Sequence, residues 1–84
     1  MTEVIMYTTN ICPYCVRAKQ LLNSKGVTYT EINLNQNPDK RAEMMEITGR
    51  RSVPQIIING EAVGGFDDIA ALNKQGELDK LLNL

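Results

Sequence analysis

Residues 4–26, VIMYTTNICPYCVRAKQLLNSKG, carry the pattern that decides the fold. The stretch begins with a short continuous apolar run over residues 4–7, which is typical of a central strand covered on both faces. A polar turn follows, and Pro13 then suits the first turn of a helix, while Gly26 suits the residue after its end. We therefore predict a strand over residues 4–7 and a helix over residues 13–25.

A second strand and a second helix are predicted further along the chain. Residues 27–33 are rich in β-branched and aromatic side chains, which favour a second and less buried strand. The Asn37-Pro38 pair predicts the cap and the first position of a helix that Gly49 ends. The apolar side chains expected at or near the core from this helix are Ala42, Met44, Met45 and Ile47.

The last half of the sequence predicts a hairpin followed by helices. Residues 55–58, Gln-Ile-Ile-Ile, contain another continuous apolar run, and Asn59-Gly60 after it is a strong signal for a two-residue hairpin turn. Residues 61–63 should therefore return as an antiparallel strand. Gly64-Gly65 breaks that strand, and Asp67 can cap a third helix. Beyond Gly76, a last amphipathic turn carries Leu78, Leu81 and Leu82.

The predicted fold class is α/β, with the order β-α-β-α-β-β-α and helices flanking an open sheet. With 84 residues, the chain should form a single domain over residues 1–84. The formal net charge of -1 offers no general attraction to nucleic acid or to an anionic membrane. Apolar runs are far shorter than the roughly 20 residues of a membrane helix, and no signal peptide is evident. We expect a cytoplasmic monomer.

Two cysteines and no histidine restrict the chemistry. A histidine base, or a structural zinc site with four cysteine or histidine ligands from one chain, is excluded. Both cysteines lie in Cys12-Pro13-Tyr14-Cys15, and in a reducing compartment such a pair indicates redox activity. Two alternatives stay open from the pair alone: half of a metal site that a second chain completes, or a chance spacing of two buried thiols.

The position of the two cysteines predicts different roles for them. Cys12 lies at a helix N-terminus, where unpaired backbone N–H groups and the helix dipole stabilise a thiolate. Cys12 should therefore attack a substrate disulfide, and Cys15 should resolve the mixed disulfide. Residues 8–26 carry Arg17, Lys19 and Lys25 but no carboxylate, so local charge should also lower the pKa of Cys12 below that of Cys15.

The chain resembles the glutaredoxin family over nearly its whole length. The resemblance implies a thioredoxin-like fold with a four-stranded mixed sheet. It also implies glutathione-dependent reduction of protein disulfides, ribonucleotide reductase among them, and of glutathionylated proteins. Glutathione would be a co-substrate, with no tightly bound cofactor and no metal. The residues that carry the resemblance are Tyr7-Thr8, Cys12-Pro13-Tyr14-Cys15, Arg17-Ala18-Lys19, Leu21-Leu22, Ser52-Val53-Pro54-Gln55-Ile56 and Gly64-Gly65-Phe66-Asp67-Asp68.

The resemblance implies a glutathione site as well as an activity. Val53 would pair its backbone with the cysteinyl part of glutathione, and its bond to Pro54 would be cis. Gly64-Gly65 would allow close backbone approach, and the start of the third helix would bind the γ-glutamyl carboxylate. Asp67 or Asp68 would face the ammonium group. Without the resemblance, the same residues favour a simple turn followed by a helix N-cap about as strongly as they favour a ligand site.

Further residues are expected around the implied site, and some of them have two descriptions. The family often has a lysine three residues before the first cysteine, where this chain has Thr9, so Arg41 is expected to meet the glycine carboxylate. The sequence fits Arg41 almost as well as a solvated residue of the second helix that binds no ligand. Tyr14 should lie exposed beside the groove. The Arg50-Arg51 pair is either a solvated charge run or a means of steering acidic substrates. Phe66 fits the core or the groove rim equally.

Two other functions compete with this one. A glutaredoxin-like redoxin reduced by thioredoxin reductase would share the fold, but residues 64–68 argue against it because such redoxins usually lack a full γ-glutamyl site. An iron-sulfur dimer, with Cys12 of two chains and glutathione as ligands, is the other alternative. Proline directly after the first cysteine, here Pro13, generally disfavours such a dimer within the family.

Overall fold

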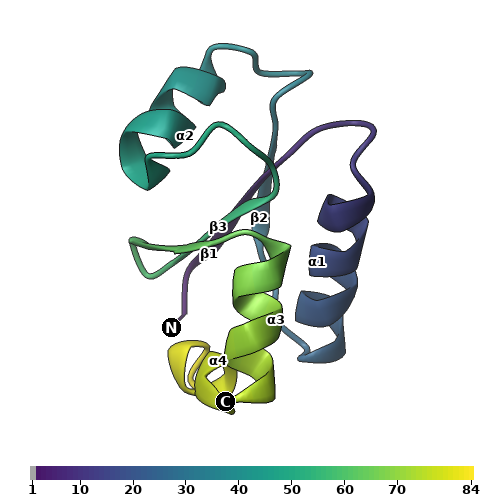
Figure 1. Ribbon diagram of the computed structural model, residues 1–84, viewed down its shortest axis with the longest axis vertical. Helices are drawn as coiled ribbons and strands as arrows, with labels where there is room; N and C mark the ends of the chain where they lie inside the picture. The colour runs from purple at the N-terminus through teal and green to yellow at the C-terminus, as the bar shows by residue number, and fades with distance from the viewer. Residues whose placement is uncertain (1) are drawn as a thin grey trace.

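Four strands form one mixed sheet in the computed structural model, which describes residues 2–84 (Figure 1). The strand order is β2-β1-β3-β4. Strand β1 pairs in parallel with β2 and antiparallel with β3, and β3 and β4 form the antiparallel hairpin. The predicted α/β class with a four-stranded mixed sheet is confirmed. The strands are β1 Val4–Thr8, β2 Thr30–Asn33, β3 Gln55–Ile58 and β4 Glu61–Gly64.

The helices lie on both faces of the sheet. Figure 1 shows α1 and α3 side by side, α4 at the end of α3, and α2 well apart from these three. None of the helices within residues 2–84 is long and apolar enough to cross a membrane. The helices are α1 Pro13–Ser24, α2 Lys40–Thr48, α3 Phe66–Lys74 and α4 Glu77–Leu81.

The core has two parts because β1 and β3 are buried on both faces. One cluster packs alternate side chains of the two strands against α1, α3 and α4; its buried members are Val4, Met6, Ala18, Leu22, Ile56, Ile58, Ile69, Leu78 and Leu82. On the other face, Tyr7 and Ile57 pack with Leu34 and with Met44 of α2. The continuous apolar runs in the sequence are therefore strands with two covered faces, as predicted.

Strand β2 is shorter than the predicted strand over residues 27–33. The parallel ladder with β1 begins at the Ile5–Thr30 pair. Before it, the Val27 N–H donates to the Leu22 carbonyl at 3.2 Å and so closes the end of α1. Val27 and Tyr29 are half-buried against the core without joining the sheet. Their β-branched and aromatic side chains thus reflect packing and not strand pairing.

Helix α2 begins later than predicted, at Lys40, with Asp39 as its N-cap. Asn37 does not cap it, because the Asn37 side-chain amide donates to the Asn33 carbonyl at 3.1 Å. The Lys40 N–H instead donates to the Asn37 carbonyl at 3.0 Å, which closes a turn ahead of the helix. Pro38 therefore lies in this turn and not at the first helical position.

Most of the apolar side chains of α2 that were predicted to lie at or near the core are exposed. Only Met44 is buried, whereas Met45, Ile47 and Ala42 are exposed. This helix has nine residues and contributes one side chain, Met44, to the core. The prediction that both methionines fill the core is right for Met44 and wrong for Met45.

Candidate functional site

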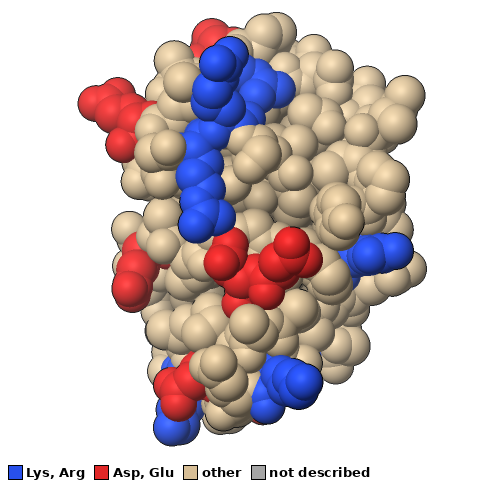
Figure 2. Space-filling view, viewed as in Figure 1, with Lys and Arg blue, Asp and Glu red and all other residues tan. Residues whose placement is uncertain are grey.

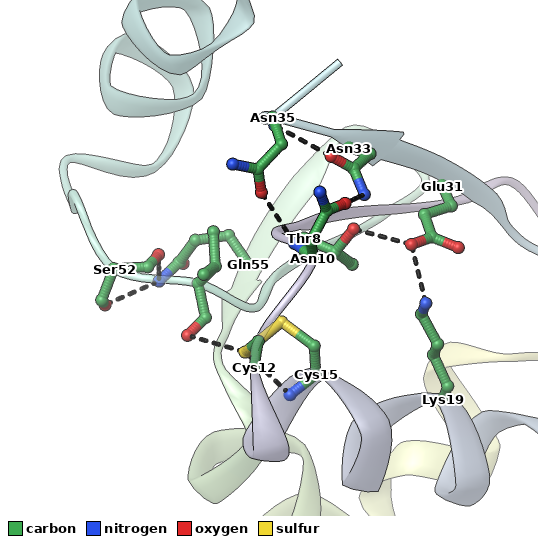
Figure 3. Close-up of a disulfide and its surroundings, with 11 residues drawn as sticks. Thr8, Asn10, Cys12, Cys15, Lys19, Glu31, Asn33, Asn35, Ser52 and Gln55 are labelled. Atoms are coloured by element: carbon green, nitrogen blue, oxygen red, sulfur yellow. Dashed lines mark hydrogen bonds and ion pairs between the residues drawn. A yellow bond between two sulfur atoms is a disulfide. The ribbon is translucent and has the colours of Figure 1, made fainter. Parts of the chain in front are cut away.

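The two cysteines lie where β1 leads into α1. Cys12 is the N-cap of α1 in an extended conformation, and Pro13 is the first residue of the helix. Cys12 and Cys15 are joined by a disulfide, and the Cys15 N–H donates to Cys12 Sγ at 3.1 Å (Figure 3). Cys15 is only 2% exposed, while Cys12 is half-buried. An incoming substrate can therefore reach the sulfur of Cys12 more readily than that of Cys15.

The segment before β3 brings a backbone carbonyl to the reactive sulfur. The Val53 carbonyl oxygen lies 3.8 Å from Cys12 Sγ. The peptide bond between Val53 and Pro54 is cis, which confirms the expectation from the family resemblance. The residue before the proline thus presents its main chain beside the disulfide, as a backbone-pairing site for an extended ligand requires.

A groove of about 250 Å³ opens between this segment, the start of α1 and the start of α3. Of the residues predicted for the site, Tyr14, Val53, Pro54, Gly65, Asp67 and Asp68 all line it. Gly64, Arg41 and the two cysteines are not among the residues that line it. The remaining lining residues, whose part the sequence did not predict or left undecided, are Arg50, Ser52, Gln55 and Phe66.

The prediction that Asp67 caps α3 is wrong, because the side chain that bonds to the N-cap backbone is that of Asp68. The N-cap residue is Gly65, and Asp68 Oδ2 accepts from the Gly65 N–H at 2.9 Å. Arg50 Nη1 donates to the same oxygen at 2.9 Å. The Gly65 N–H, followed by Arg50, lowers the pKa of Asp68. A carboxylate at the third helical position can reach back to the cap in this way, whereas exposed Asp67 stands at the groove.

The two glycines before α3 allow close contacts inside the chain. Gly64 is buried with a φ of +108°, and a Cβ atom there would overlap the Asp68 carboxylate. A Cβ atom on Gly65 would lie 3.1 Å from the Pro54 carbonyl oxygen. Gly64 thus leaves the space that the Asp68 carboxylate occupies, and Gly65 lets the start of α3 approach the cis-proline segment.

The arginines near the groove have different positions. Arg41 is exposed on α2, and its Nη1 donates to the Arg51 carbonyl at 2.7 Å. Figure 2 shows a band of basic side chains running into acidic side chains on this face of the molecule. The Arg50–Asp68 ion pair joins a basic and an acidic group at the groove itself. Arg50 is therefore part of the site, although the sequence alone favoured a solvated charge.

Arg50 also sets a testable pH dependence. In the Arg50→Ala variant, the pKa of Asp68 should rise towards its ordinary value of 3.8 without reaching it, because the Gly65 N–H still donates. The carboxyl carbon chemical shift in an NMR pH titration measures this pKa. A depressed pKa contributes stability at higher pH that is lost as pH falls through the folded-state pKa. The stability difference between variant and wild type should therefore shrink in acid.

A suitable control for this prediction is Lys80→Ala. It removes a comparable surface ion pair with Glu77 in α4, away from the groove. This variant should leave the pKa of Asp68 unchanged. An unchanged Asp68 pKa in Arg50→Ala would show that the ion pair does not form in solution.

The predicted basic surroundings of Cys12 need correction. Lys19 Nζ lies 2.7 Å from Glu31 Oε2, which also accepts from the Thr8 hydroxyl at 2.7 Å (Figure 3). Lys19 and then Thr8 lower the pKa of Glu31. Lys25 pairs with Asp79 at 2.8 Å. Two of the three cations in residues 8–26 are thus paired with carboxylates that the fold brings from elsewhere, so they add little positive potential at the sulfur.

Three asparagines hold the loop that precedes Cys12, and the sequence reasoning missed them. The Asn10 N–H donates to Asn35 Oδ1 at 2.7 Å, and Asn33 Nδ2 donates to Asn10 Oδ1 at 2.9 Å (Figure 3). The Asn35 N–H in turn donates to Asn33 Oδ1 at 2.8 Å. These bonds join the carboxyl ends of β1 and β2. The only signal in the sequence is an asparagine after each of two strands predicted to be parallel.

Gln55 and Phe66 complete the walls of the groove. Gln55 is buried at the start of β3, and its side-chain amide donates to the Ser52 carbonyl at 3.0 Å. Phe66 packs partly against the core and lies with its ring centroid 6.3 Å from that of Tyr14. It therefore contributes to both the core and the groove rim, which the sequence could not decide. Within residues 2–84, no three Cys, Asp or Glu side chains gather as in a metal site.

Comparison with known proteins gives one consistent result. Residues 4–63 match the family model described as Glutaredoxin. The chain is 50% identical over 82 residues to Glutaredoxin 3 of Escherichia coli, covering 98% of this chain and 99% of that protein. The solution structure of glutaredoxin from Brucella melitensis matches with a TM-score of 0.85 and 51% identity, over 98% of this chain and 89% of that one. A buckwheat glutaredoxin–glutathione complex matches with a TM-score of 0.90 and 29% identity, over 98% and 77% respectively.

Proposed function

Since this chain belongs to the glutaredoxin family and is a glutathione-dependent thiol-disulfide oxidoreductase, we propose that Cys12 is its nucleophile and Cys15 its resolving thiol. The observation that carries this assignment is the contrast between the two sulfurs. Cys12 caps α1 at the surface and accepts the Cys15 N–H, whereas Cys15 is buried. In the dithiol form these same donors favour a thiolate on Cys12, and we predict a lower pKa for Cys12 than for Cys15.

The proposed reaction takes two courses. With a glutathionylated protein, the Cys12 thiolate attacks the glutathione sulfur and releases the protein thiol. A second glutathione then attacks the Cys12–glutathione disulfide, which leaves glutathione disulfide and free Cys12. With a protein disulfide, Cys15 attacks the mixed disulfide, and two glutathione molecules later reduce the Cys12–Cys15 bond. Cys15 is therefore needed only in the second course.

We propose that glutathione lies in the groove with its cysteinyl part against Val53. The carbonyl oxygen of Val53 is 3.8 Å from Cys12 Sγ, so a glutathione sulfur bonded to Cys12 would lie close to the Val53 main chain. The first turn of α3 offers N–H groups to the γ-glutamyl carboxylate. Asp67 is our assignment for the ammonium group, because it is exposed in the groove while Asp68 Oδ2 already accepts two hydrogen bonds.

The other end of glutathione is assigned to Arg41, the expected partner of the glycine carboxylate. One of its donors holds the Arg51 carbonyl, and the guanidinium has further donors for a carboxylate. Tyr14 would contact the bound glutathione at the edge of the groove. Gly64 and Gly65 would contribute indirectly, because Gly64 leaves room for the Asp68 carboxylate and Gly65 lies close to the Pro54 carbonyl. The buckwheat relative was solved in complex with glutathione, which supports glutathione as co-substrate here.

Substitution of the two charged groups tests this placement. Asp67→Asn and Arg41→Ala should each raise the KM for a glutathione mixed disulfide by roughly fivefold, with kcat little changed, because each removes one charge contact to bound glutathione. The assay couples turnover to glutathione reductase and NADPH. Asp39→Asn, a similar change at the exposed N-cap residue of α2, whose side chain makes no capping hydrogen bond, serves as the control. An unchanged KM in either test variant would remove that residue from the site.

The partners we propose are glutathionylated proteins and proteins with reducible disulfides, ribonucleotide reductase being one candidate. We propose that the single domain over residues 1–84 acts as a monomer and binds no metal or nucleic acid. A cytoplasmic location suits a thiol pair that must be kept reduced between turnovers.

A further inference from the structure

Helix α2 lies apart from the other three helices and buries little of its surface (Figure 1). Of its nine residues only Met44 is buried, in the cluster that also contains Tyr7 and Ile57. A helix with a single core side chain can still turn about that contact, because few buried contacts leave a segment free to move. A further contact is therefore needed to fix how α2 lies over the sheet.

A hydrogen bond from the centre of the sheet supplies such a contact. The Tyr7 hydroxyl donates to Glu43 Oε1 at 2.8 Å, and Tyr7 is only 1% exposed. Burial first, and Glu43 second, raise the pKa of Tyr7 to about 12. The Tyr7 hydroxyl, followed by Lys40, lowers the pKa of Glu43. Near neutral pH the donor is therefore a phenol and the acceptor a carboxylate, which makes a charge-assisted hydrogen bond.

Filling the core does not account for the Tyr7 hydroxyl. The ring packs with Leu34, Met44 and Ile57, and a phenylalanine ring would occupy the same place. A buried hydroxyl group needs a hydrogen-bond partner, and here that partner is a side chain of α2. The hydroxyl thus fixes the helix relative to β1, while the ring fills the space between them.

Both ends of this hydrogen bond lie beside residues that we place in the glutathione site. Val53 packs against the cluster that contains Tyr7. Glu43 lies two residues after Arg41 on the same helix. The bond therefore ties the helix that carries Arg41 to the strand that leads to the cysteines. Neither Tyr7 nor Glu43 is among the residues that line the groove, so they can act on a ligand only through α2.

We propose that Glu43, held by Tyr7, is a positioning residue that fixes α2 so that Arg41 meets the glycine carboxylate of glutathione. This inference rests on the proposed role of Arg41. Cys12 and the Val53 main chain hold the middle of glutathione in our placement. The glycine end can then reach Arg41 only if α2 lies at a set distance from them, and the Tyr7–Glu43 bond sets that distance.

Tyr7→Phe tests the proposal, because it removes the hydroxyl and keeps the buried ring. It should raise the KM for the mixed disulfide of glutathione and β-mercaptoethanol about threefold, with kcat within about twofold of wild type. Glu43→Ala should have the same effect. Glu43→Gln keeps an oxygen that accepts the hydrogen bond, so its KM should stay near that of wild type. Chromatography of the remaining mixed disulfide gives both constants.

A neutral substrate and a double variant show whether Arg41 carries the effect. Glutathione amide has a neutral amide in place of the glycine carboxylate, so Tyr7→Phe should leave the KM for its β-mercaptoethanol disulfide unchanged. In the Arg41→Ala background, Tyr7→Phe should add no further increase, because both changes remove the same contact. Glu46→Ala removes an exposed carboxylate from the same helix and should behave as wild type.

Each contrary outcome has its own meaning. A KM increase in Tyr7→Phe that is equal for the amide substrate, or that adds to the increase in Arg41→Ala, would make the bond purely structural and overturn the positioning proposal. An unchanged KM in Tyr7→Phe, with a raised KM in Arg41→Ala, would overturn it too. If Arg41→Ala changed nothing, both the assignment of Arg41 and this inference would be wrong. No turnover by wild type would overturn the proposed function, and this inference with it.

Discussion

Replacement of Cys12 by serine should reduce the rate of deglutathionylation by on the order of a thousandfold or more, because the hydroxyl cannot form the mixed disulfide. Cys15→Ser should retain most of this activity. The contact that Cys15 makes to Cys12 Sγ comes from its backbone N–H, which serine keeps. Reduction of a protein disulfide should instead be lost in both variants, because that course needs the second thiol.

Both activities can be followed with glutathione, glutathione reductase and NADPH. A glutathionylated peptide and an intramolecular peptide disulfide are the two substrates. Alkylation rates of the single-cysteine variants across a pH range give the pKa of each thiol and show whether Cys12 is the more acidic. If Cys15→Ser lost both activities to the same extent, or if Cys15 were the more acidic thiol, the assigned roles would be wrong.

Gly64→Ala should be strongly destabilising, with an expected loss of about 3 kcal/mol in the free energy of unfolding. Gly64 has a φ of +108°, a conformation that side chains strongly disfavour. Its new Cβ would also overlap the Asp68 carboxylate, which caps α3 through Gly65 and pairs with Arg50. Displacement of Asp68 should disturb the start of α3, so the KM for a glutathione mixed disulfide should rise as well.

Urea unfolding followed by circular dichroism measures the stability change. Gly49→Ala is the matched control: Gly49 has a φ of +72°, but a Cβ there meets nothing within 4 Å. This control should lose only about 1 kcal/mol, the cost of the left-handed conformation alone. Equal losses in the two variants would show that contact with Asp68 adds nothing, and an unchanged KM in Gly64→Ala would separate the glycine from the glutathione site.

Local patterns were enough to predict the order of the strands and the hairpin. Residues 56–58 form a continuous apolar run because β3 is buried on both faces of the sheet. Asn59 and Gly60 both have positive φ, as the two-residue turn requires. The cis bond at Pro54 came from the family resemblance, since no local property of the sequence distinguishes it from an ordinary trans bond.

The errors about the charged side chains have a common physical cause: each depends on a partner distant in the sequence. The segment around the cysteines contains no carboxylate that could pair with Lys19 or Lys25. In the fold, Lys19 pairs with Glu31 and Lys25 pairs with Asp79. Asn37 looked like a helix cap, but its amide bonds to Asn33. Local rules give a polar side chain its possible partners, and tertiary structure decides among them.

The candidate site was predicted more completely on the side near the cysteines than on the side near α2. Tyr14, Val53, Asp67 and Asp68 were expected in the groove and line it. The sequence described Arg50 only as part of a basic pair, either solvated or steering acidic substrates, and only the tertiary structure shows its contact with Asp68. A charged residue in a loop has no periodicity from which its direction could be predicted.

The contact between the Cys15 N–H and Cys12 Sγ links this protein's redox chemistry to its thermodynamic stability. Folding and disulfide reduction form a closed cycle of four states, so their free energies are not independent. If the start of α1 favours the thiolate, it favours the reduced folded state over the oxidised folded state by that amount, relative to the unfolded chain. On that condition, the first turn of one helix contributes to a higher reduction potential for the Cys12–Cys15 pair than the same two cysteines have in an unfolded chain.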